Sequence, residues 1–339
     1  MTRYSVSMEF LRVQEAPQII RWGIVGPGHA GARFAEGLKA VEGASLEAVW
    51  GRTPERTQAF ALKFGVRQIF DSLDGLVAAD VDAVYVATHP DSHAAICIQA
   101  LEAGKHVLCE KPAALNERQL VEVLTVACRC NRLFMEAMKP PFFPLYRRLR
   151  EHLLADPIGP VGFVRAGHVD ASLSKKHPLH SAELGGGGVM GIGPYEAFLA
   201  LDWLGKLKRV QTMGRVGTAG VDTLALFQTE HEHGMAQLHT GLDLLGRGDA
   251  LLCGPRGYVT IHENWWNPRR ASIRYMDGRR VELDEPFEAG GFNYETAHFC
   301  ELMRQGRRDS PLIPHALSLG MARLLESARR ELGVRFPGE

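Results

Sequence analysis

The sequence predicts an α/β protein in which a Rossmann domain, built on a doubly wound parallel sheet, precedes a domain with an antiparallel sheet. Three observations carry this prediction. A glycine-rich turn, Gly26 to Gly31, opens the first helix, and strands and helices alternate from residue 19 to residue 139. After residue 140, short alternating segments separated by turns dominate, which is typical of antiparallel strands.

Length and charge indicate how the chain is divided and which partners it takes. With 339 residues, 45% of them apolar, the chain exceeds the size at which a single core stops growing. We expect an N-terminal extension at 1–18, a dinucleotide-binding Rossmann domain at 19–139 and a substrate and oligomerisation domain at 140–339. The 39 basic residues equal the 39 acidic ones, which argues against nucleic acid or a membrane as partner and leaves a small molecule.

The N-terminus and the cysteines favour a cytoplasmic protein. Residues 1–18 lack the apolar core of a signal peptide, and Met8 is an alternative start. The six cysteines form no CxxC pair, and Cys109 and Cys253 lie in apolar runs. We therefore expect reduced core cysteines and no metal site.

The apolar pattern predicts the elements of the first domain in order. Short apolar runs predict strands and amphipathic runs predict helices. Gly104 is a predicted helix C-cap, and Asn116 a predicted N-cap. The predicted strands are 19–25, 45–50, 69–70, 81–87, 105–109 and 133–138, and the predicted helices are 30–40, 53–64, 93–103 and 116–130.

The second half predicts an antiparallel meander between helices. Lys139-Pro140-Pro141 marks the change of pattern, and Asp277-Gly278 is one of the predicted turns. The predicted strands are 161–168, 208–215, 221–228, 235–240, 250–252, 258–261, 272–276 and 279–283, and the predicted helices are 144–154, 294–305 and 315–332.

The glycine-rich turn predicts a dinucleotide site. Gly28 lets the backbone approach a pyrophosphate at the helix N-terminus, and Gly31 lets helix and strand pack closely. An NAD site places a carboxylate about 20 residues further on, but this chain has Arg52 and Thr53 there. A guanidinium suits a 2′-phosphate, so we expect NADP rather than NAD. Arg52 as an ordinary solvated loop residue is the alternative.

Lys111 is the first candidate for chemistry. The run His106 to Cys109 predicts a strand that delivers Glu110, Lys111 and Pro112 to its carboxyl end, where ligands bind in doubly wound sheets. The proline restricts the backbone beside the ammonium. A surface lysine before a loop is the alternative.

These motifs resemble the glucose-fructose oxidoreductase / inositol dehydrogenase / MocA family over about residues 19 to 337. The Glu136-Ala137-Met138 segment and the Gly291 to Glu295 run are similar to its dihydrodiol and xylose dehydrogenase branch. The resemblance implies a C-terminal α/β domain with an open, mostly antiparallel sheet that often forms dimers. It also implies hydride transfer between NAD(P) and a secondary alcohol of a sugar, cyclitol or diol.

The resemblance also implies roles for single residues. Lys111 matches the lysine that approaches the reacting oxygen, and Tyr195 matches the proton donor, whose pKa we expect a nearby ammonium to lower. Gly191 departs from the family pattern, which has Asp there, and this puts catalysis in doubt. The cofactor-binding residues implied by the matched motifs and the Arg52 argument are Gly26, Gly28, His29, Ala30, Gly31, Arg52, Thr53, Thr88, His89, His93, Glu110 and Lys111.

Three further clusters have weaker interpretations. His231-Glu232-His233-Gly234 is predicted to be a polar hairpin turn rather than a metal site. Trp265-Trp266 is a candidate for sugar stacking, a subunit contact or core packing. Lys175, His177 and His180 lie before the glycine run, where a substrate would enter, with a solvated face as the alternative.

Two hypotheses of function follow. The first is an NADP-dependent oxidoreductase of a sugar, cyclic polyol or diol, using Lys111 and Tyr195 and forming a homodimer or homotetramer through the C-terminal sheet. The second is a catalytically silent NAD(P)-binding regulator or scaffold of the same fold, because Gly191 replaces the expected carboxylate.

Overall fold

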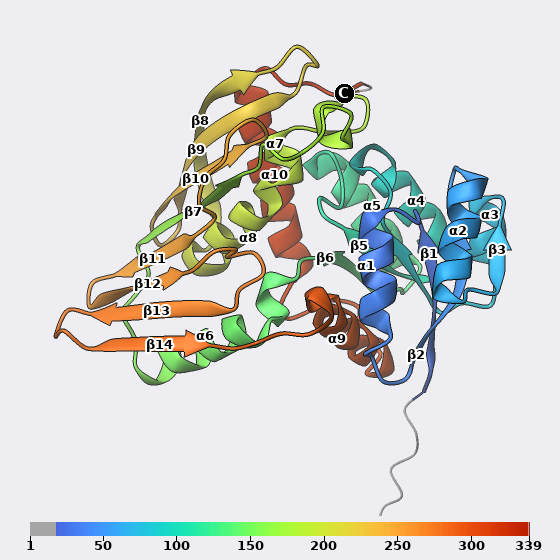
Figure 1. Ribbon diagram of the computed structural model, residues 1–339, viewed down its shortest axis with the longest axis horizontal. Helices are drawn as coiled ribbons and strands as arrows, with labels where there is room; N and C mark the ends of the chain where they lie inside the picture. The colour runs from blue at the N-terminus through green and yellow to red at the C-terminus, as the bar shows by residue number, and fades with distance from the viewer. Residues whose placement is uncertain (1–17, 338) are drawn as a thin grey trace, which may run out of the picture.

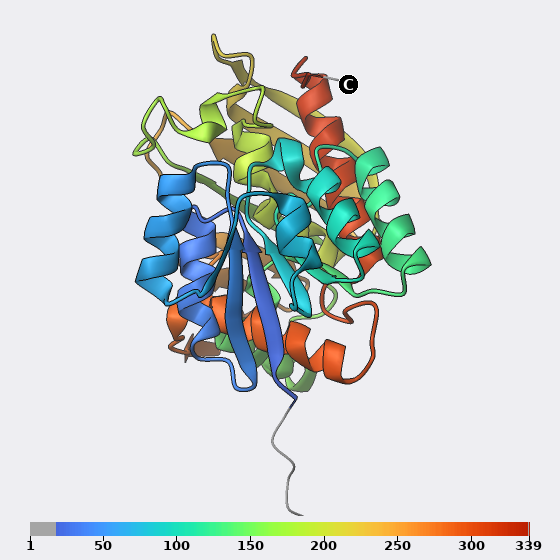
Figure 2. The same cartoon turned by 90° about the vertical axis from the view of Figure 1, so that its right-hand side faces the viewer.

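The computed structural model describes residues 18–337 and 339, and residues 1–17, including Met8, lie outside these residues. It contains two sheets that stand apart with helices between them (Figure 1). The first sheet carries helices on both of its faces (Figure 2). The predicted fold class, a parallel Rossmann sheet followed by a mostly antiparallel one, is confirmed.

The first sheet has six parallel strands in the order β3-β2-β1-β4-β5-β6. The order reverses between β1 and β4, and in such sheets ligands bind at the carboxyl ends of the strands beside that point. The strands are β1 (Ile20–Val25), β2 (Ala44–Trp50), β3 (Gln68–Phe70), β4 (Ala83–Val86), β5 (His106–Glu110) and β6 (Phe134–Ala137).

The helices of this half follow from their capping residues. Asn116 caps its helix by accepting a hydrogen bond from the Gln119 amide, and Gly104 has a φ of 80° directly after another helix, as predicted. A short helix capped by Ser72 was not predicted. The helices are α1 (His29–Leu38), α2 (Pro54–Phe64), α3 (Leu73–Ala78), α4 (Pro90–Glu102) and α5 (Glu117–Arg129).

The second sheet has eight strands in the order β14-β13-β12-β11-β7-β10-β9-β8. Two antiparallel meanders flank β7, but β7 and β10 are parallel, so the prediction of one antiparallel meander is wrong at this pair. The strands are β7 (Phe163–Val169), β8 (Leu207–Val216), β9 (Asp222–His231), β10 (Met235–Gly241), β11 (Ala250–Gly254), β12 (Gly257–Ile261), β13 (Arg270–Tyr275) and β14 (Arg280–Asp284).

Helices cover the face of this sheet that turns toward the first sheet (Figure 1). One of them, α8, was not predicted, because the sequence before it reads as a glycine-rich loop. The helices of this half are α6 (Pro144–Ala155), α7 (Gly188–Gly191), α8 (Gly193–Leu204), α9 (Phe292–Arg304) and α10 (His315–Glu331), with short 3₁₀ turns at Pro140–Phe142, Pro178–His180 and Ala289–Gly291.

On the opposite face of the second sheet, no helix among residues 18–337 covers the strands, and exposed apolar side chains lie there. Phe163 of β7 pairs with Met235 of β10, and Leu226 of β9 pairs with Met213 of β8. All four side chains are exposed. Buried and exposed residues alternate around Phe163, Leu226 and Met235, which therefore point away from the helices, and Met213 shares this face because it pairs with Leu226.

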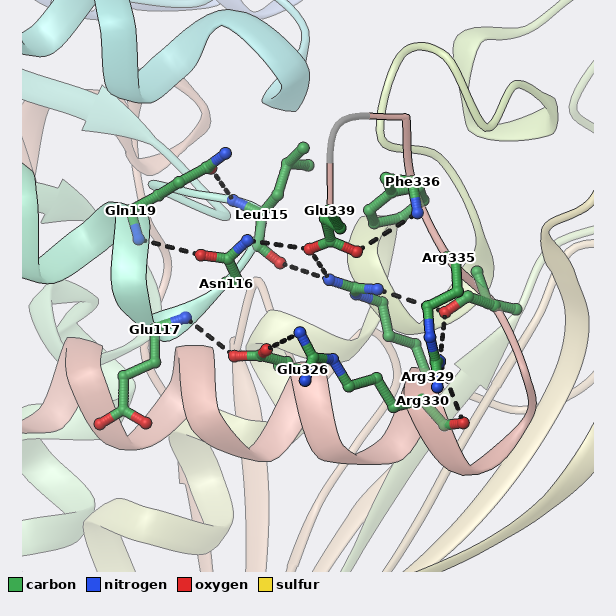
Figure 3. Close-up of polar contacts among 11 residues, drawn as sticks. Leu115, Asn116, Glu117, Gln119, Glu326, Arg329, Arg330, Arg335, Phe336 and Glu339 are labelled. Atoms are coloured by element: carbon green, nitrogen blue, oxygen red, sulfur yellow. Dashed lines mark hydrogen bonds and ion pairs between the residues drawn. The ribbon is translucent and has the colours of Figure 1, made fainter.

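The end of the chain joins the two halves (Figure 3). Arg329 of α10 is fully buried, donates to the backbone oxygen of Leu115 in the first half, and pairs with the Glu339 carboxylate. The Glu339 carboxylate also accepts from the Asn116 amide nitrogen at 2.8 Å. Glu339 therefore neutralises a buried guanidinium that contacts both halves.

Some smaller features match or limit the sequence predictions. The His231 amide donates to the Gly234 oxygen at 2.8 Å, which confirms the hairpin turn between β9 and β10. The described residues contain no group of three or more metal-ligating side chains. None of the helices described here has the length and apolarity needed to cross a bilayer.

We predict that Glu339→Ala lowers the free energy of unfolding by about 3 kcal/mol, because it leaves the Arg329 guanidinium buried without its carboxylate. Denaturant unfolding measures this change. The matched control is Glu122→Ala, which removes an exposed pair with Arg118 and should change stability by less than about 1 kcal/mol. Equal effects of the two substitutions would contradict the prediction.

Candidate active site

A cavity of about 360 Å³ lies beside the point where the strand order reverses. Its walls come from the ends of β1, β2 and β4 and from the turns that follow them. The lining residues are Gly26, Pro27, Gly28, Trp50, Gly51, Arg52, Thr53, Arg56, Ala87, Thr88, His89, Ser92 and Ile96. The glycine-rich turn and the predicted phosphate-binding arginine thus share one cavity.

The glycines of the turn have the roles that the spacing predicts. Gly26 has a φ of 96°, and a Cβ there would lie 2.7 Å from the Ala87 carbonyl carbon. A Cβ on Gly31 would lie 2.6 Å from the Gly26 oxygen. A Cβ on Gly28 would meet no protein atom within 4 Å, so its backbone is open to a ligand at the N-terminus of α1.

Two cationic residues line the side of the cavity below β2. These are Arg52, which lies beside Thr53, and Arg56, which is one turn further along the chain. The sequence analysis did not single out Arg56. His89 faces the same space, and its pKa is lowered by burial and by the nearby Arg52 charge. The cavity therefore keeps its positive charge on guanidinium groups, which suits a phosphate.

Some predicted cofactor residues do not line this cavity. His93 is buried, and its ring nitrogens lie 2.8 Å from the Pro112 oxygen and 3.2 Å from the Thr88 oxygen. The prediction that His93 contacts the cofactor is wrong, because both nitrogens are occupied by backbone groups that the ring holds in place. His29 and Ala30 begin α1 beside the cavity but are absent from its lining.

Glu110 is also turned toward the protein. Its carboxylate accepts from the Tyr85 hydroxyl and, at 3.2 Å, from the Lys111 amide. In this arrangement Glu110 fixes the end of β5 and supplies negative charge near Lys111, rather than facing the cavity.

Lys111 joins the two halves of the molecule. Its Nζ donates to the Gly191 oxygen at 2.6 Å and lies 4.6 Å from the centre of the Tyr195 ring. Burial lowers the pKa of Lys111, and the charges of Glu110 and Glu196 oppose that effect. The structure therefore brings together the two predicted catalytic side chains, with the ammonium over the ring face.

The effect of this ammonium on Tyr195 differs from the prediction. The pKa of Tyr195 is raised well above its usual value by burial and by the carboxylates of Glu110 and Glu295. The expectation that Lys111 lowers this pKa is wrong because burial and the two carboxylates outweigh its charge. Tyr195 consequently keeps its proton at neutral pH.

Gly191 is the last residue of α7 and does not have a positive φ. Its backbone conformation therefore does not require glycine. A Cβ on Gly191 would lie 2.3 Å from Leu179 Cδ2. The space in which the family pattern places a carboxylate is occupied by an apolar side chain from the preceding 3₁₀ turn.

The segment from residue 171 to 187 carries the predicted substrate residues. Lys175 and His177 are exposed, and His180 is half-buried. Burial, followed by the charges of His180 and His89, lowers the pKa of His177, which places this segment near the cofactor cavity. A Cβ on Gly185 would lie 2.4 Å from Leu115, so the segment also contacts the first half of the chain.

Sequence reasoning missed several side chains around Lys111 and Tyr195. Glu196 is fully buried on α8, and its Oε1 lies 4.0 Å from His168 Nδ1. The His168 ring stacks on Trp266 at 3.9 Å, and the fully buried Trp265 meets Tyr195 edge-on. Trp265 thus packs in the core beside Tyr195, whereas Trp266 is half-buried and stacks on His168.

Asp222 of β9 is a further residue that only the structure reveals. Its Oδ2 accepts from the Val189 amide at 2.8 Å and would be 3.0 Å from a Cβ on Gly188. The carboxylate therefore holds the start of α7, and small residues are required there because it approaches so closely. In the sequence, the glycines at 187 and 188 were a possible signal for this role, because they leave room for a side chain from another part of the chain.

Comparisons with known proteins agree with this arrangement. A family model described as an oxidoreductase family with an NAD-binding Rossmann fold matches residues 20–138. The scyllo-inositol 2-dehydrogenase (NADP(+)) IolU of Bacillus subtilis (strain 168) is 30% identical over 330 residues, covering 95% of this chain and 99% of the relative. The chain belongs to the glucose-fructose oxidoreductase / inositol dehydrogenase / MocA family of oxidoreductases.

Other relatives of this family place the chain near a particular branch. The human trans-1,2-dihydrobenzene-1,2-diol dehydrogenase is 30% identical over 335 residues, covering 94% of this chain and 98% of that protein. The resemblance to the family and to its dihydrodiol dehydrogenases is confirmed.

Solved structures share the fold. The 3-ketoreductase KijD10 from Actinomadura kijaniata, in complex with NADP and TDP-benzene, superposes with a TM-score of 0.82 at 23% identity, covering 93% of this chain and 98% of that one. The two-sheet arrangement described above is therefore that of other members of the structural class.

We predict that Gly191→Ala destabilises the protein by about 1 to 3 kcal/mol, because the added Cβ overlaps Leu179. Leu179→Ala should relieve this cost, so a double-mutant cycle measured by denaturant unfolding should show a favourable coupling. The control pair is Gly28→Ala with Leu179→Ala, since Gly28 has open space around it and should not couple. Additive effects at Gly191 and Leu179 would contradict the overlap.

Proposed function

We propose that the protein is an NADP-dependent oxidoreductase that transfers hydride between the nicotinamide and a secondary alcohol or ketone of a sugar, cyclic polyol or diol. The observation that carries the proposal is the Lys111 ammonium, held at the end of β5 against Gly191 and Tyr195. Membership of the oxidoreductase family supports the reaction class, and the NADP(+) enzyme named above supports the cofactor.

The residues present fit NADP. The open backbone at Gly28 and the N-terminus of α1 would hold the diphosphate, and Arg52 would hold the 2′-phosphate. When bound, the cofactor supplies or accepts the hydride. These features also fit the prediction that residues 19–139 form the cofactor domain.

The chain's own side chains would handle the oxygen and its proton. The Lys111 ammonium would hold the reacting oxygen and stabilise negative charge on it. Tyr195 keeps a proton at neutral pH and, together with Lys111, would supply it to that oxygen during reduction. The segment with Lys175, His177 and His180 would lie over the substrate.

A catalytically silent NAD(P)-binding regulator is the second candidate. One observation favours it: position 191 has no carboxylate, and Leu179 fills the space. Intact Lys111 and Tyr195 favour the enzyme.

We also propose a cytoplasmic homodimer or homotetramer built on the second sheet. The free cysteines fit a reducing compartment. The exposed apolar face with Phe163, Met213, Leu226 and Met235 fits a subunit contact.

The test of function is consumption of NADPH with a panel of sugar ketones and dicarbonyls. Lys111→Ala should lower kcat by about 10² to 10⁴, since it removes the charge beside the reacting oxygen. NADPH binding should persist. The control is Lys105→Ala, just before the opposite end of β5, where the ammonium contacts the Ala79 and Val81 oxygens. A folded protein that binds NADPH but reduces none of the ketones would favour the regulator.

We predict that NADP binds more tightly than NAD and that Arg52→Asp reverses the order. The loss of a charged phosphate contact corresponds to about a tenfold to hundredfold change in Kd. Titration calorimetry with both cofactors measures it. Arg67→Asp, an exposed arginine outside the cavity, makes the same charge change and should leave the order intact. Equal affinities in the unmodified protein would refute the assignment of Arg52.

The subunit prediction is a dimer or larger assembly at micromolar concentration in light scattering. Leu226→Lys should shift it toward the monomer, because it places a charge in the apolar face. Leu154→Lys is the matched control, since Leu154 is an exposed leucine on α6, away from that face. A monomeric unmodified protein would rule this assembly out.

A further inference from the structure

A cluster of buried polar side chains lies within range of the Lys111 charge, and one of its members, Trp265, meets Tyr195 edge-on. Within the described residues, neither carboxylate oxygen of Glu196 nor His168 Nδ1 makes a hydrogen bond of normal geometry, and the Trp265 indole lies near enough to Glu196 to act against the rise of its pKa. Glu196 follows Tyr195 on α8 and is fully buried. Buried polar atoms are satisfied in most proteins, and leaving each unsatisfied costs about 1 to 3 kcal/mol.

Two of these groups face one another. Glu196 Oε1 lies 4.0 Å from His168 Nδ1, slightly beyond a hydrogen bond, so a small movement of either side chain would join them. The His168 ring cannot turn freely because it stacks on Trp266 with an interplanar angle of 23°. Trp266 in turn packs against the backbone at Gly248, where a Cβ would lie 2.4 Å from its ring.

The pair also connects the interior with the surface. The Glu196 side chain has no exposed area, whereas 15% of the His168 side chain is exposed although its Nδ1 is buried. His168 therefore presents one nitrogen to Glu196 and other ring atoms to solvent. Glu196 also lies close enough to Lys111 for each charge to act on the pKa of the other group.

The charges around the pair determine where its proton resides. Burial raises the pKa of Glu196 to about 8, although the Lys111 charge opposes this. Burial is the main cause that lowers the pKa of His168 to about 4. The charges of Lys111 and His239 act in the same direction, and the charge of Asp170 opposes them. At neutral pH the pair thus holds one acidic proton, on Glu196.

We propose that Glu196 is a positioning residue for the reaction proposed above, and that with His168 it forms a proton-holding pair that resupplies Lys111 and Tyr195 from solvent. The inference rests on the proposed function. It is carried by the fully buried Glu196 carboxyl within range of the Lys111 charge, and by the facing His168 imidazole that reaches the surface.

The proton balance is simple. Ketone reduction places one proton on the substrate oxygen, given by Tyr195 or Lys111. Glu196 returns a proton to that donor and becomes a carboxylate, whose charge stabilises the Lys111 ammonium. His168 gives its Nδ1 proton to Glu196 and takes one from water on its exposed side. One solvent proton enters for each proton transferred, and no electrons pass through the pair.

The test is the pH profile of ketone reduction by Glu196→Gln, a variant of the same shape that holds no acidic proton. We expect kcat to fall by about 10²-fold. The basic limb of kcat/KM should also move to lower pH by about one unit, because the carboxylate no longer supports the Lys111 ammonium. His168→Gln should lower kcat, whereas His231→Gln, a buried histidine on β9 that contacts Thr229 and the Gly205 oxygen, should not.

A second readout does not require turnover. The pKa of Glu196 is raised from 4.5 to about 8, so the stability that this group contributes is present below pH 4.5 and is lost as the pH rises toward 8. Glu196→Gln stays neutral throughout. The Tm of the variant minus that of the unmodified protein should therefore grow from pH 5 to pH 9.

The outcomes separate the two proposals. An active unmodified protein with Glu196→Gln of equal kcat and an unmoved pH profile would overturn the pair and leave the proposed function standing. A uniform loss of rate without movement of the basic limb would indicate packing alone and also overturn it. A flat Tm difference between pH 5 and pH 9 would show that Glu196 holds no proton. Absence of turnover in the unmodified protein would overturn the proposed function itself.

Discussion

The hydrogen bond from the Lys111 ammonium to the Gly191 oxygen is the interaction on which the candidate site depends. It joins the end of β5 in the first sheet to α7 in the second half of the chain. A buried ammonium is costly unless carboxylates and carbonyls surround it. Glu110 supplies negative charge near it, and Glu136 and Glu196, whose pKa values burial raises to about 7 and about 8, add negative charge when they lose their protons.

The glycine run and Asp222 determine where that carbonyl lies. Asp222 accepts from the Val189 amide and comes so close to Gly187 and Gly188 that side chains there would collide with it. Helix α8 follows directly and carries Tyr195 and Glu196 toward Lys111. The geometry around the ammonium therefore depends on β9, a strand far from it in the sequence, through one carboxylate.

Local patterns could predict the frame of the molecule. The strands of the first sheet are mostly short apolar runs, and their parallel arrangement follows from alternation with helices, so both were accessible from residues 19–139 alone. Helix α8 was not, because Gly193 and Pro194 at its start look like loop residues and its body is apolar on all sides, with no amphipathic period. The parallel pairing of β7 with β10 was also inaccessible, since the helices α7 and α8 and the strands β8 and β9 lie between these two strands in the sequence.

The site shows the same division between local and tertiary information. The glycine turn, Arg52 and Lys111 were identified because each follows a predicted strand. His93 was misassigned, because a histidine in a motif does not reveal which backbone oxygens its ring meets. The pKa of Tyr195 was misjudged for a related reason: only the fold shows that Glu110 and Glu295 come close enough to outweigh one ammonium.

The replacement of a carboxylate by Gly191 and Leu179 has a physical consequence beyond the loss of one acid. A further carboxylate beside Lys111 would add to the negative charge that already raises the pKa of Tyr195 and would attract water into the junction. Leu179 instead keeps this space apolar. In a drier junction the remaining charges interact more strongly, and the raised pKa values of Tyr195 and Glu196 both follow from burial as the first cause. Without a carboxylate at position 191, the charges of the groups around Lys111 therefore interact more strongly with one another.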